Sequence, residues 1–427
     1  MIRKTIFRHL YVQVLVAILI GVFVGCQFPD FGLELKPISD GFIRLIRMMV
    51  PPIIFTSVVV GMAGMGDLKR VGTIGLKSLL YFEGMTTLAL VLGFAVVKLF
   101  QPGAGVNATA AQLDPKLVET YVNTARHESV AEFLLNIIPR SIVGAFAEGE
   151  IIQVLFVSVF FGIALMSLGG SKQSIVHALD VVYHALMKMI AIIIKLAPLG
   201  AFAAIAYSIS KFGPESIKSM ARLLASVYLT CFFFVIIFLG AMLRFNGISL
   251  WKFLRYIREE IFIVLGTASS ESVFPRILAK MENMGCSKPV TGLVMPAGYT
   301  FNLDGSSIYL TLGAIYIAQA TNTHLSFWKE LGIVALCIIT SKGAAAVVGS
   351  AFITLAATLA ATHAIPVEGM VLVLGVDQLM ASARATTNLI GNGTATIVIA
   401  RWEKEFDSRR AEAVLNGREP EAAGSPG

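Results

Sequence analysis

The sequence has few charged residues. Only 14% of its 427 residues are Asp, Glu, Lys or Arg, and 56% are hydrophobic, whereas soluble proteins carry about 25% charged residues. The segments 9–29, 151–171 and 223–243 contain none of these four residue types. Each segment is long enough to cross a bilayer, which takes about 20 helical residues. The composition therefore excludes an ordinary soluble protein and predicts an all-α polytopic membrane protein.

The sequence also lacks the motifs of metal sites and common enzymes. Its four cysteines, Cys26, Cys231, Cys286 and Cys337, are scattered and show neither metal-ligand spacing nor a disulfide pattern. It contains no His-Glu-x-x-His, Walker or Gly-x-Ser-x-Gly motif. An intramembrane serine protease built on 269–272 would need a His or Lys base, and none is evident nearby. We therefore expect no enzyme activity, no cofactor and no resident metal.

The basic residues are grouped in particular loops. The net charge is +7, whereas the loops at 29–40 and 101–135 carry more acidic than basic residues. Cytoplasmic loops of membrane proteins are enriched in Lys and Arg, so this alternation predicts that both termini are cytoplasmic. The basic groups thus indicate membrane orientation, and we expect no nucleic-acid partner. They lie at 3–8, 69–77, 244–258 and 401–410.

The apolar pattern divides the chain into two parts. Beyond residue 250 the apolar runs become rich in Gly, Ser, Ala and Thr, and 286–317 and 368–401 have the composition of helices. Each of these is preceded by a run with a polar or small-residue centre, at 261–280 and 343–367. We predict a re-entrant helix–turn–helix for both runs, rather than one further crossing for the second. Six spans are predicted before residue 250, at 9–28, 42–65, 76–99, 148–169, 185–210 and 222–243.

Both C-terminal helices are predicted to be interrupted, by NLDGSS at 302–307 and by NLIGNGTA at 388–395. Paired glycine-containing interruptions indicate a transporter site at the bilayer midplane, because unwound backbone at that depth needs a cavity or ligand. The alternative is two structural helices with glycines for close packing. That alternative leaves Asp304, Asp377 and Arg384 without a role.

The last helix has a polar stripe. Asp377, Ala381, Arg384, Asn388 and Asn392 are spaced by four, three, four and four residues, so they share one face of a helix. A helix-centre Arg or Asp costs roughly 2.5–3.5 kcal/mol to insert. We expect that Asp377 and Arg384, two turns apart, do not pair with each other. The guanidinium is therefore predicted to bind a carboxylate of an anionic substrate.

The chain resembles a known family, the dicarboxylate/amino acid:cation symporters, and within it the bacterial aerobic C4-dicarboxylate carriers. The resemblance covers about 9–403, and ARATTNLIGNG is its most specific part. It implies eight transmembrane helices, two re-entrant hairpins, a homotrimer in the bacterial inner membrane and an elevator motion. The motifs are SSES (269–272), NLDG (302–305), SKGAAAVVGS (341–350), NIIPRSIVGAFAEGEIIQV (136–154) and ARATTNLIGNG (383–393).

The resemblance also implies a domain organisation. Residues 1–250 would form mainly the scaffold and trimer contacts, with helix 76–99 joining the transport core at 251–403. The tail, 404–427, is predicted to be disordered. The core would contain hairpin 253–285, helix 286–317, hairpin 330–362 and helix 368–401.

Site residues follow by position from the same resemblance. Arg384 would bind one substrate carboxylate, and the rest of the substrate would contact Asn388, Ser306, Ser270, Ser269 and Gly349. Glu271, at the tip of the first hairpin, is a candidate proton carrier. The co-transported cations, H⁺ or Na⁺ or both, would use Asp304, Asp377, Asn302, Thr300, Gly298, Thr86 and Thr87.

Two positions depart from the family pattern. Amino-acid carriers have an Asp where this chain has Ala381, and an ammonium group without that partner would be buried and unpaired. We therefore expect succinate, fumarate or malate as substrate, with a glutamate or aspartate symporter as the alternative. Sodium-coupled members have an Asp in place of Asn392, so one hard ligand is missing and protons are favoured. A sodium site at Asp304, Asp377 and Asn302 stays open, as does a channel lined by Ser, Thr and Asn.

Overall fold

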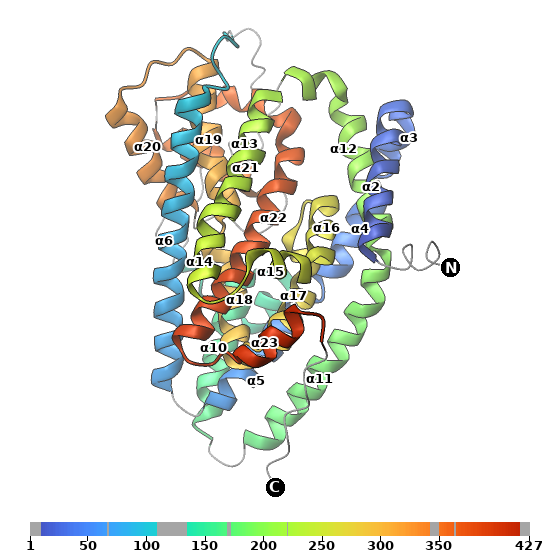
Figure 1. Cartoon of the computed structure of the whole chain (residues 1–427), viewed down its shortest axis with the longest axis vertical. Coiled ribbons are helices and arrows are strands. Elements are labelled where there is room, and N and C mark those ends of the chain that lie inside the picture. Colours follow the sequence, from blue (N-terminus) through green and yellow to red (C-terminus); the bar gives the residue numbers. More distant parts are fainter. Residues whose placement is uncertain are drawn as a thin grey trace.

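The computed structural model describes residues 10–65, 68–108, 135–168, 172–219, 221–341, 350–362 and 364–418. These residues form helices and connecting turns, with no strand among them beyond an isolated bridge between Cys286 and Phe406. The prediction of an all-α protein is confirmed. Figure 1 shows α22 (Val371–Trp402) passing through the interior, between α6 (Leu68–Phe100) and the pair formed by α2 (Leu10–Gln27) and α12 (Ala197–Ser219).

The six spans predicted in the first part are mostly helical where the structure describes them. Three helical stretches of the described chain, Lys69–Phe100, Lys172–Tyr207 and Ala221–Phe245, are long and apolar enough to cross a membrane. A 3₁₀ turn, η4 (Ile194–Leu196), joins α11 to α12, and a π-helical segment, η5 (Phe234–Leu239), joins α13 to α14. The remaining helices here are α3 (Pro29–Glu34), α4 (Lys36–Arg47), α5 (Val50–Met65), α9 (Ile142–Glu148), α10 (Ile151–Met166), α11 (Lys172–Ile193), α13 (Ala221–Phe233) and α14 (Gly240–Phe245).

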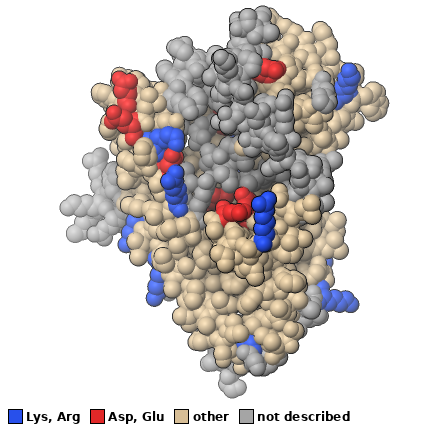
Figure 2. Space-filling view, turned by 180° about the vertical axis from the view of Figure 1, so that it is seen from behind, with Lys and Arg blue, Asp and Glu red and all other residues tan. Residues whose placement is uncertain are grey.

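The outer surface of these helices is strongly apolar. Leu19 and Phe23 on α2, Leu80 on α6 and Phe232 on α13 are all more than half exposed. Figure 2 shows one face of the molecule, on which charged side chains are few where the surface is described. An apolar surface of this extent marks contact with a membrane or with another protein. It fits the membrane protein that the composition predicts.

Each of the two segments predicted as hairpins contains helices separated by a non-α-helical or undescribed stretch. Hairpin 1 consists of α15 (Leu250–Tyr256), α16 (Arg258–Thr267), a 3₁₀ turn η6 (Ser270–Val273) and α17 (Phe274–Asn283). Hairpin 2 consists of α20 (Phe327–Thr340) and α21 (Ser350–Thr362). Of its predicted turn, Gly349 lies outside the described residues, and Ser350 begins α21. The re-entrant course of both segments stays a prediction, and Ser350 lies in a helix rather than in a turn.

Only one of the two predicted helix interruptions exists. The first helix ends at Phe301 and resumes at Asp304, giving α18 (Lys288–Phe301) and α19 (Asp304–Ala320). The second prediction is wrong, because α22 continues without a break through 388–395. A glycine costs a helix only about 1 kcal/mol. Gly391 allows close packing instead: a Cβ there would lie 2.4 Å from Asp304 Oδ2.

The chain beyond α22 differs from the disordered tail that we predicted. It forms a short helix, α23 (Ser408–Leu415), whose N-cap Asp407 accepts a hydrogen bond from the Arg410 amide at 3.0 Å. The segment before it pairs with the chain that follows α17. Ser287 N donates to Glu405 O at 3.1 Å, and Asp407 N donates to Gly285 O at 2.9 Å. These long-range backbone contacts order the segment, and composition alone does not reveal them.

Candidate functional site

The break between α18 and α19 lies against α22, and Asn388 joins the two. Its Oδ1 accepts a hydrogen bond from Gly305 N at 2.7 Å, and its Nδ2 donates to Ser306 Oγ at 3.3 Å. Gly305 permits this approach, because a Cβ there would lie 2.4 Å from the Arg384 carbonyl oxygen. The side chains of Asn388, Ser306 and Arg384 are all buried. Three residues expected to contact substrate are therefore neighbours.

Arg384 forms an ion pair within its own helix. Its Nη1 donates to Asp377 Oδ1 at 2.7 Å, so the expectation that these residues do not pair is wrong. Seven helical residues rise about 10.5 Å but return to within about 20° of the same face. Helical side chains lean toward the N-terminus of their helix. The long arginine therefore reaches the aspartate two turns before it.

The Arg384 guanidinium also lies on an aromatic ring. Its central carbon is 4.0 Å from the centroid of Tyr309 on α19, a cation–π geometry that is strengthened by burial. Arg384 is 4% exposed. Its second nitrogen, Nη2, is 3.5 Å from Asp377 Oδ2, so the aspartate holds one nitrogen closely and the other loosely. A guanidinium has five N–H donors, which leaves capacity for a second carboxylate.

Oxygen-bearing side chains gather beside the helix break. Asn302 Nδ2 donates to Asn392 Oδ1 at 3.0 Å, while Asn302 Oδ1 has no hydrogen-bond partner in the described chain. A Cβ at Gly298 would lie 2.4 Å from Asn392 Oδ1. Asp304, which faces Gly391, is fully buried like Asn302. Hard cations prefer carboxylate and amide oxygens, so this cluster can hold a small cation.

This cluster is not a conventional metal centre. Within the ranges described, no three His, Cys, Asp or Glu side chains lie together as metal ligands. The oxygen atoms of this cluster are those of one carboxylate, from Asp304, and of the amide side chains of Asn302 and Asn392.

The tip of hairpin 1 is buried and rich in hydroxyl groups. Ala268, in the left-handed conformation with φ of 53°, ends α16. Tyr299 OH donates to Ser270 O at 2.9 Å, and Ser272 Oγ donates to Ser269 O at 2.6 Å. Ser269 Oγ is buried with no hydrogen-bond partner among the described residues. Since buried polar atoms are normally paired, this hydroxyl is a candidate ligand contact.

The other expected site residues take different positions. Glu271 is buried at the hairpin tip. Thr86 is buried and Thr87 half-buried on α6, which packs against α18 and α19. Thr300 is buried near the end of α18, and Gly349 lies outside the described residues.

Sequence reasoning missed Tyr309. A tyrosine in an apolar helix is usually an ordinary core residue, and nothing in the sequence around it pairs it with Arg384. Only the packing of α19 on α22 brings the ring to the guanidinium.

Comparison with known proteins gives consistent results. Residues 10–402 match the sodium:dicarboxylate symporter family. The chain is 53% identical over 421 residues to the C4-dicarboxylate transport protein of Laribacter hongkongensis, covering 99% of this chain and 96% of the relative. It is 52% identical over 418 residues to that of Anaeromyxobacter sp. (strain K), covering 98% and 95%. It is also 52% identical over 421 residues to that of Citrifermentans bemidjiense, covering 98% and 96%.

Proposed function

Because the chain belongs to the sodium:dicarboxylate symporter family, we propose that it imports C4-dicarboxylates such as succinate, fumarate and malate together with cations. The relatives compared above are C4-dicarboxylate transport proteins by name. The observation that carries the proposal is the buried Arg384, held between Asp377 and the Tyr309 ring beside Asn388 and Ser306. A fixed cation at this depth needs an anionic partner in every state of the cycle.

Substrate binding exchanges one carboxylate for another. In the structure, Asp377 neutralises Arg384, with Nη1 and Oδ1 2.7 Å apart. A substrate carboxylate binds the guanidinium bidentately and weakens its hold on Asp377. The released aspartate then favours a cation or a proton, because an unpaired buried carboxylate is costly. Substrate and cation binding are thereby linked through a single residue pair.

The second substrate carboxylate would lie toward α19 and hairpin 1. The N-terminus of α19 carries partial positive charge, and Ser306 and Asn388 stand there. Ser269, whose hydroxyl has no hydrogen-bond partner among the described residues, would complete the contacts together with Ser270 and the backbone at Gly349. Hydrogen bonds from hydroxyl and amide groups suit a carboxylate without demanding a second arginine.

Substrate choice depends on Ala381. This residue is buried one turn before Arg384 on α22 and has no carboxylate to pair with an ammonium group. An amino-acid substrate would bury its amine unpaired, at considerable cost. The site therefore prefers C4-dicarboxylates to aspartate or glutamate.

Electrical work sets the minimum number of co-transported charges. Moving a dianion into a negative interior costs about 2.3 kcal/mol per charge per 100 mV, hence roughly 4.6 kcal/mol. Two cations neutralise that cost. We favour protons, because Asn392 supplies an amide in place of a carboxylate and already accepts a hydrogen bond from Asn302. Asp304, Asp377 and Glu271 are the buried carboxyl groups that are candidates to carry them.

The proposed assembly is a homotrimer in the bacterial inner membrane with both termini cytoplasmic. Each subunit would have eight transmembrane helices and two re-entrant hairpins, with 251–403 and helix 76–99 moving as an elevator against the scaffold. The basic clusters and the exposed apolar side chains on α2, α6 and α13 support a bilayer-embedded subunit.

Uptake of radiolabelled succinate by proteoliposomes tests the proposal. We expect saturable uptake, exchange with preloaded succinate and little competition by L-aspartate. The Ala381→Asp variant should bind succinate more weakly, through like-charge repulsion. L-Aspartate should compete with labelled succinate more effectively in this variant than in the wild type. Preference of the wild type for L-aspartate would make it an amino-acid symporter. Non-saturable flux without exchange would make it a channel.

A further inference from the structure

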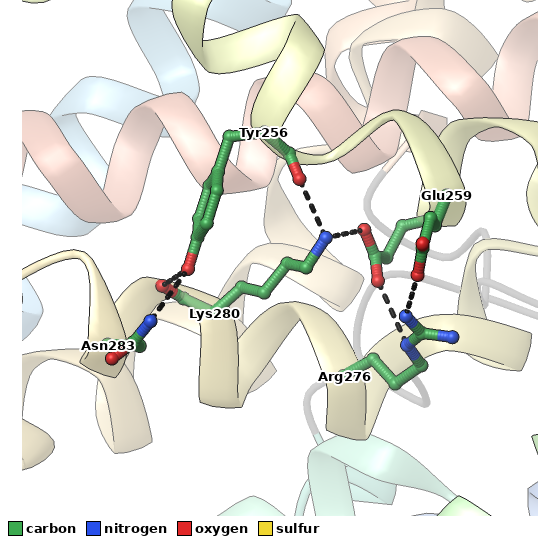
Figure 3. Close-up of polar contacts among 6 residues, drawn as sticks. Tyr256, Glu259, Arg276, Lys280 and Asn283 are labelled. Atoms are coloured by element: carbon green, nitrogen blue, oxygen red, sulfur yellow. Dashed lines mark hydrogen bonds and ion pairs between the residues drawn. The ribbon is translucent and has the colours of Figure 1, made fainter. Parts of the chain in front are cut away.

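The two arms of hairpin 1 are joined by a charge cluster. We define it as Glu259 and Glu260 in the first turn of α16 together with Arg276 and Lys280, one turn apart on α17. Arg276 Nε lies 2.9 Å from Glu260 Oε1, and Lys280 Nζ lies 2.6 Å from Glu260 Oε2. Arg276 also pairs with Glu259. Figure 3 shows Arg276 and Lys280 pointing from one helix toward the acidic side chains of the other.

Glu260 is the centre of the cluster. Its side chain is 0% exposed, whereas those of Glu259, Arg276 and Lys280 are 20–27% exposed. Each oxygen of this carboxylate faces a different cation. Parting the arms would leave a buried carboxylate uncompensated, which is among the most unfavourable changes in a protein interior. Separation of the two arms is therefore opposed by the cost of leaving the Glu260 carboxylate buried without its cations.

Hydrogen bonds beyond the ion pairs reinforce the same junction. Lys280 Nζ donates to Tyr256 O at 2.7 Å, and Tyr256 OH donates to Lys280 O at 3.1 Å. Asn283 Nδ2 donates to Tyr256 OH at 3.3 Å. As Figure 3 shows, Tyr256 and Lys280 bridge the end of α15 and α17 in both directions. The corner between α15 and α16 is thus bound to the second arm as firmly as the first turn of α16 is.

Hairpin 2 cannot be joined in this way. Its second arm, α21, contains no Asp, Glu, Lys or Arg. Across its described arms, Thr340 and Thr358 share a hydrogen bond of 2.8 Å. The ion-pair junction is therefore specific to hairpin 1, and a general need to join helical arms does not explain it.

We propose that Glu260 is a positioning residue. Through Arg276 and Lys280 it keeps the arms of hairpin 1 together as one rigid unit throughout transport, so that the serine tip moves without parting of α16 from α17. The tip's contact with substrate rests on the proposed function. The rigidity of the arms does not, and it can be measured without transport.

A distance measurement tests the rigidity. Nitroxide labels are placed at Arg255→Cys on α15 and Ala279→Cys on α17, in a Cys26→Ser background, because the other three cysteines are buried. Ala279 lines a surface cavity of about 480 Å³, which leaves room for a label. Double electron–electron resonance should give one narrow distribution of distances between the two labels, unchanged by succinate. Glu260→Gln should broaden or lengthen it.

The control removes a comparable ion pair elsewhere. Glu330, on α20, is largely buried and bound by Lys98 at 3.0 Å. Glu330→Gln should leave the hairpin 1 distance unchanged. If Glu260→Gln does not insert, Lys280→Gln, which keeps the Arg276 pair, takes its place. A wild-type distance that shifts with succinate would overturn the proposal, as would an unchanged distance in both Glu260→Gln and Lys280→Gln.

Transport kinetics separate positioning from a purely structural role. In Glu260→Gln we expect KM for succinate to rise about tenfold, the equivalent of one lost hydrogen bond, with little change in Vmax per folded molecule. The swapped variant, Glu260→Lys with Lys280→Glu, should recover only part of the KM, because it re-forms one ion pair between the arms but places a lysine opposite Arg276. A lower yield of folded protein with unchanged KM and unchanged label distance would show that the cluster serves folding alone. If succinate is not a substrate, the label distances still decide the question.

Discussion

Arg384 and Asp377 neutralise each other in the interior of the molecule, and this pairing changes what a substitution of either residue should do. Each residue belongs to the proposed binding site and is also the other's buried counter-ion. Loss of one partner of a buried pair costs about 3–5 kcal/mol of stability. An alanine substitution of one partner therefore alters both substrate binding and stability. The two effects are separated by substituting both partners together.

Arg384→Ala combined with Asp377→Asn should fold but fail to bind succinate. The double variant leaves no buried charge unpaired, yet it removes the cation that receives the carboxylate. We expect succinate affinity to fall at least 100-fold, about 2.7 kcal/mol, with a smaller loss of thermal stability than in Arg384→Ala alone. Calorimetric binding and thermal unfolding measure the two effects. Arg384→Lys should also bind poorly, because lysine lacks the planar fork. Near-normal affinity in the double variant would remove Arg384 from the substrate site.

Glu282 gives the folded protein a pH dependence. It lies near the end of α17, outside the candidate membrane spans. Burial raises its pKa from 4.5 to about 7, although Lys288 and His184 act in the opposite direction. Between these two pH values the folded state holds a proton that the unfolded state has released. The free energy of unfolding therefore falls as pH rises from about 4.5 to about 7, and this contribution is constant above that range.

The Glu282→Gln variant should lose this pH dependence. Its side chain is uncharged at every pH, so its unfolding temperature should decline less than that of the wild type between pH 5 and 7.5. The variant should also be the more stable of the two at pH 7.5. Thermal unfolding in detergent at both pH values measures the difference. Glu412→Gln, at an exposed position on α23, is the matched control. Equal slopes for wild type and Glu282→Gln would refute the assignment.

Among the elements, the contact between α19 and α22 depends on the absence of a side chain at Gly305. A Cβ there would lie 2.4 Å from the carbonyl oxygen of Arg384 and 2.7 Å from its Cα. Both are backbone atoms, which cannot turn aside as a flexible side chain would. The hydrogen bond from Gly305 N to Asn388 would be lost with the displacement.

Gly305→Ala should therefore destabilise the protein by about 1–3 kcal/mol and weaken succinate binding. The control is Gly332→Ala on α20, where a Cβ would meet nothing within 4 Å. That substitution should be neutral or stabilising by up to about 1 kcal/mol, because alanine favours the helix. Thermal unfolding and succinate binding test both variants. Wild-type behaviour in Gly305→Ala would show that α19 and α22 are farther apart than described.

At the scale of the whole molecule, the coupling ion decides which gradient drives accumulation of the substrate, and we propose that this ion is the proton. Proteoliposomes with an inward proton gradient in sodium-free medium should accumulate succinate. Asn392→Asp restores a carboxylate beside Asn302 and Asp304, so we expect it to increase the dependence on sodium. Accumulation in wild type that requires sodium, and is unaffected by the proton gradient, would replace protons by sodium as the coupling ion.

Much of the architecture follows from the sequence because its causes are local. An uncharged apolar run of bilayer length forms a helix wherever it lies. The polar side chains of NLDGSS need hydrogen-bond partners that an apolar helix surface does not offer. The helix is interrupted there, at Asn302 and Leu303. The spacing of Arg384, Asn388 and Asn392 places them on one face of α22 regardless of its surroundings. Ser306 lies on another helix and enters the predicted site through the family resemblance alone, and the structure places its hydroxyl against Asn388.

The tertiary structure decided what depends on neighbours distant in sequence. The glycines near Asn388 were predicted to break α22, yet they serve close packing against Asp304 and Phe253, and the helix continues. The rotamer of Arg384 is set by Asp377 and by the Tyr309 ring, which spacing alone does not reveal. The tail forms α23 because the backbone before it pairs with the chain after α17. Helix formation and polarity are properties of a segment, whereas pairing of charges and docking of backbone depend on which segments meet.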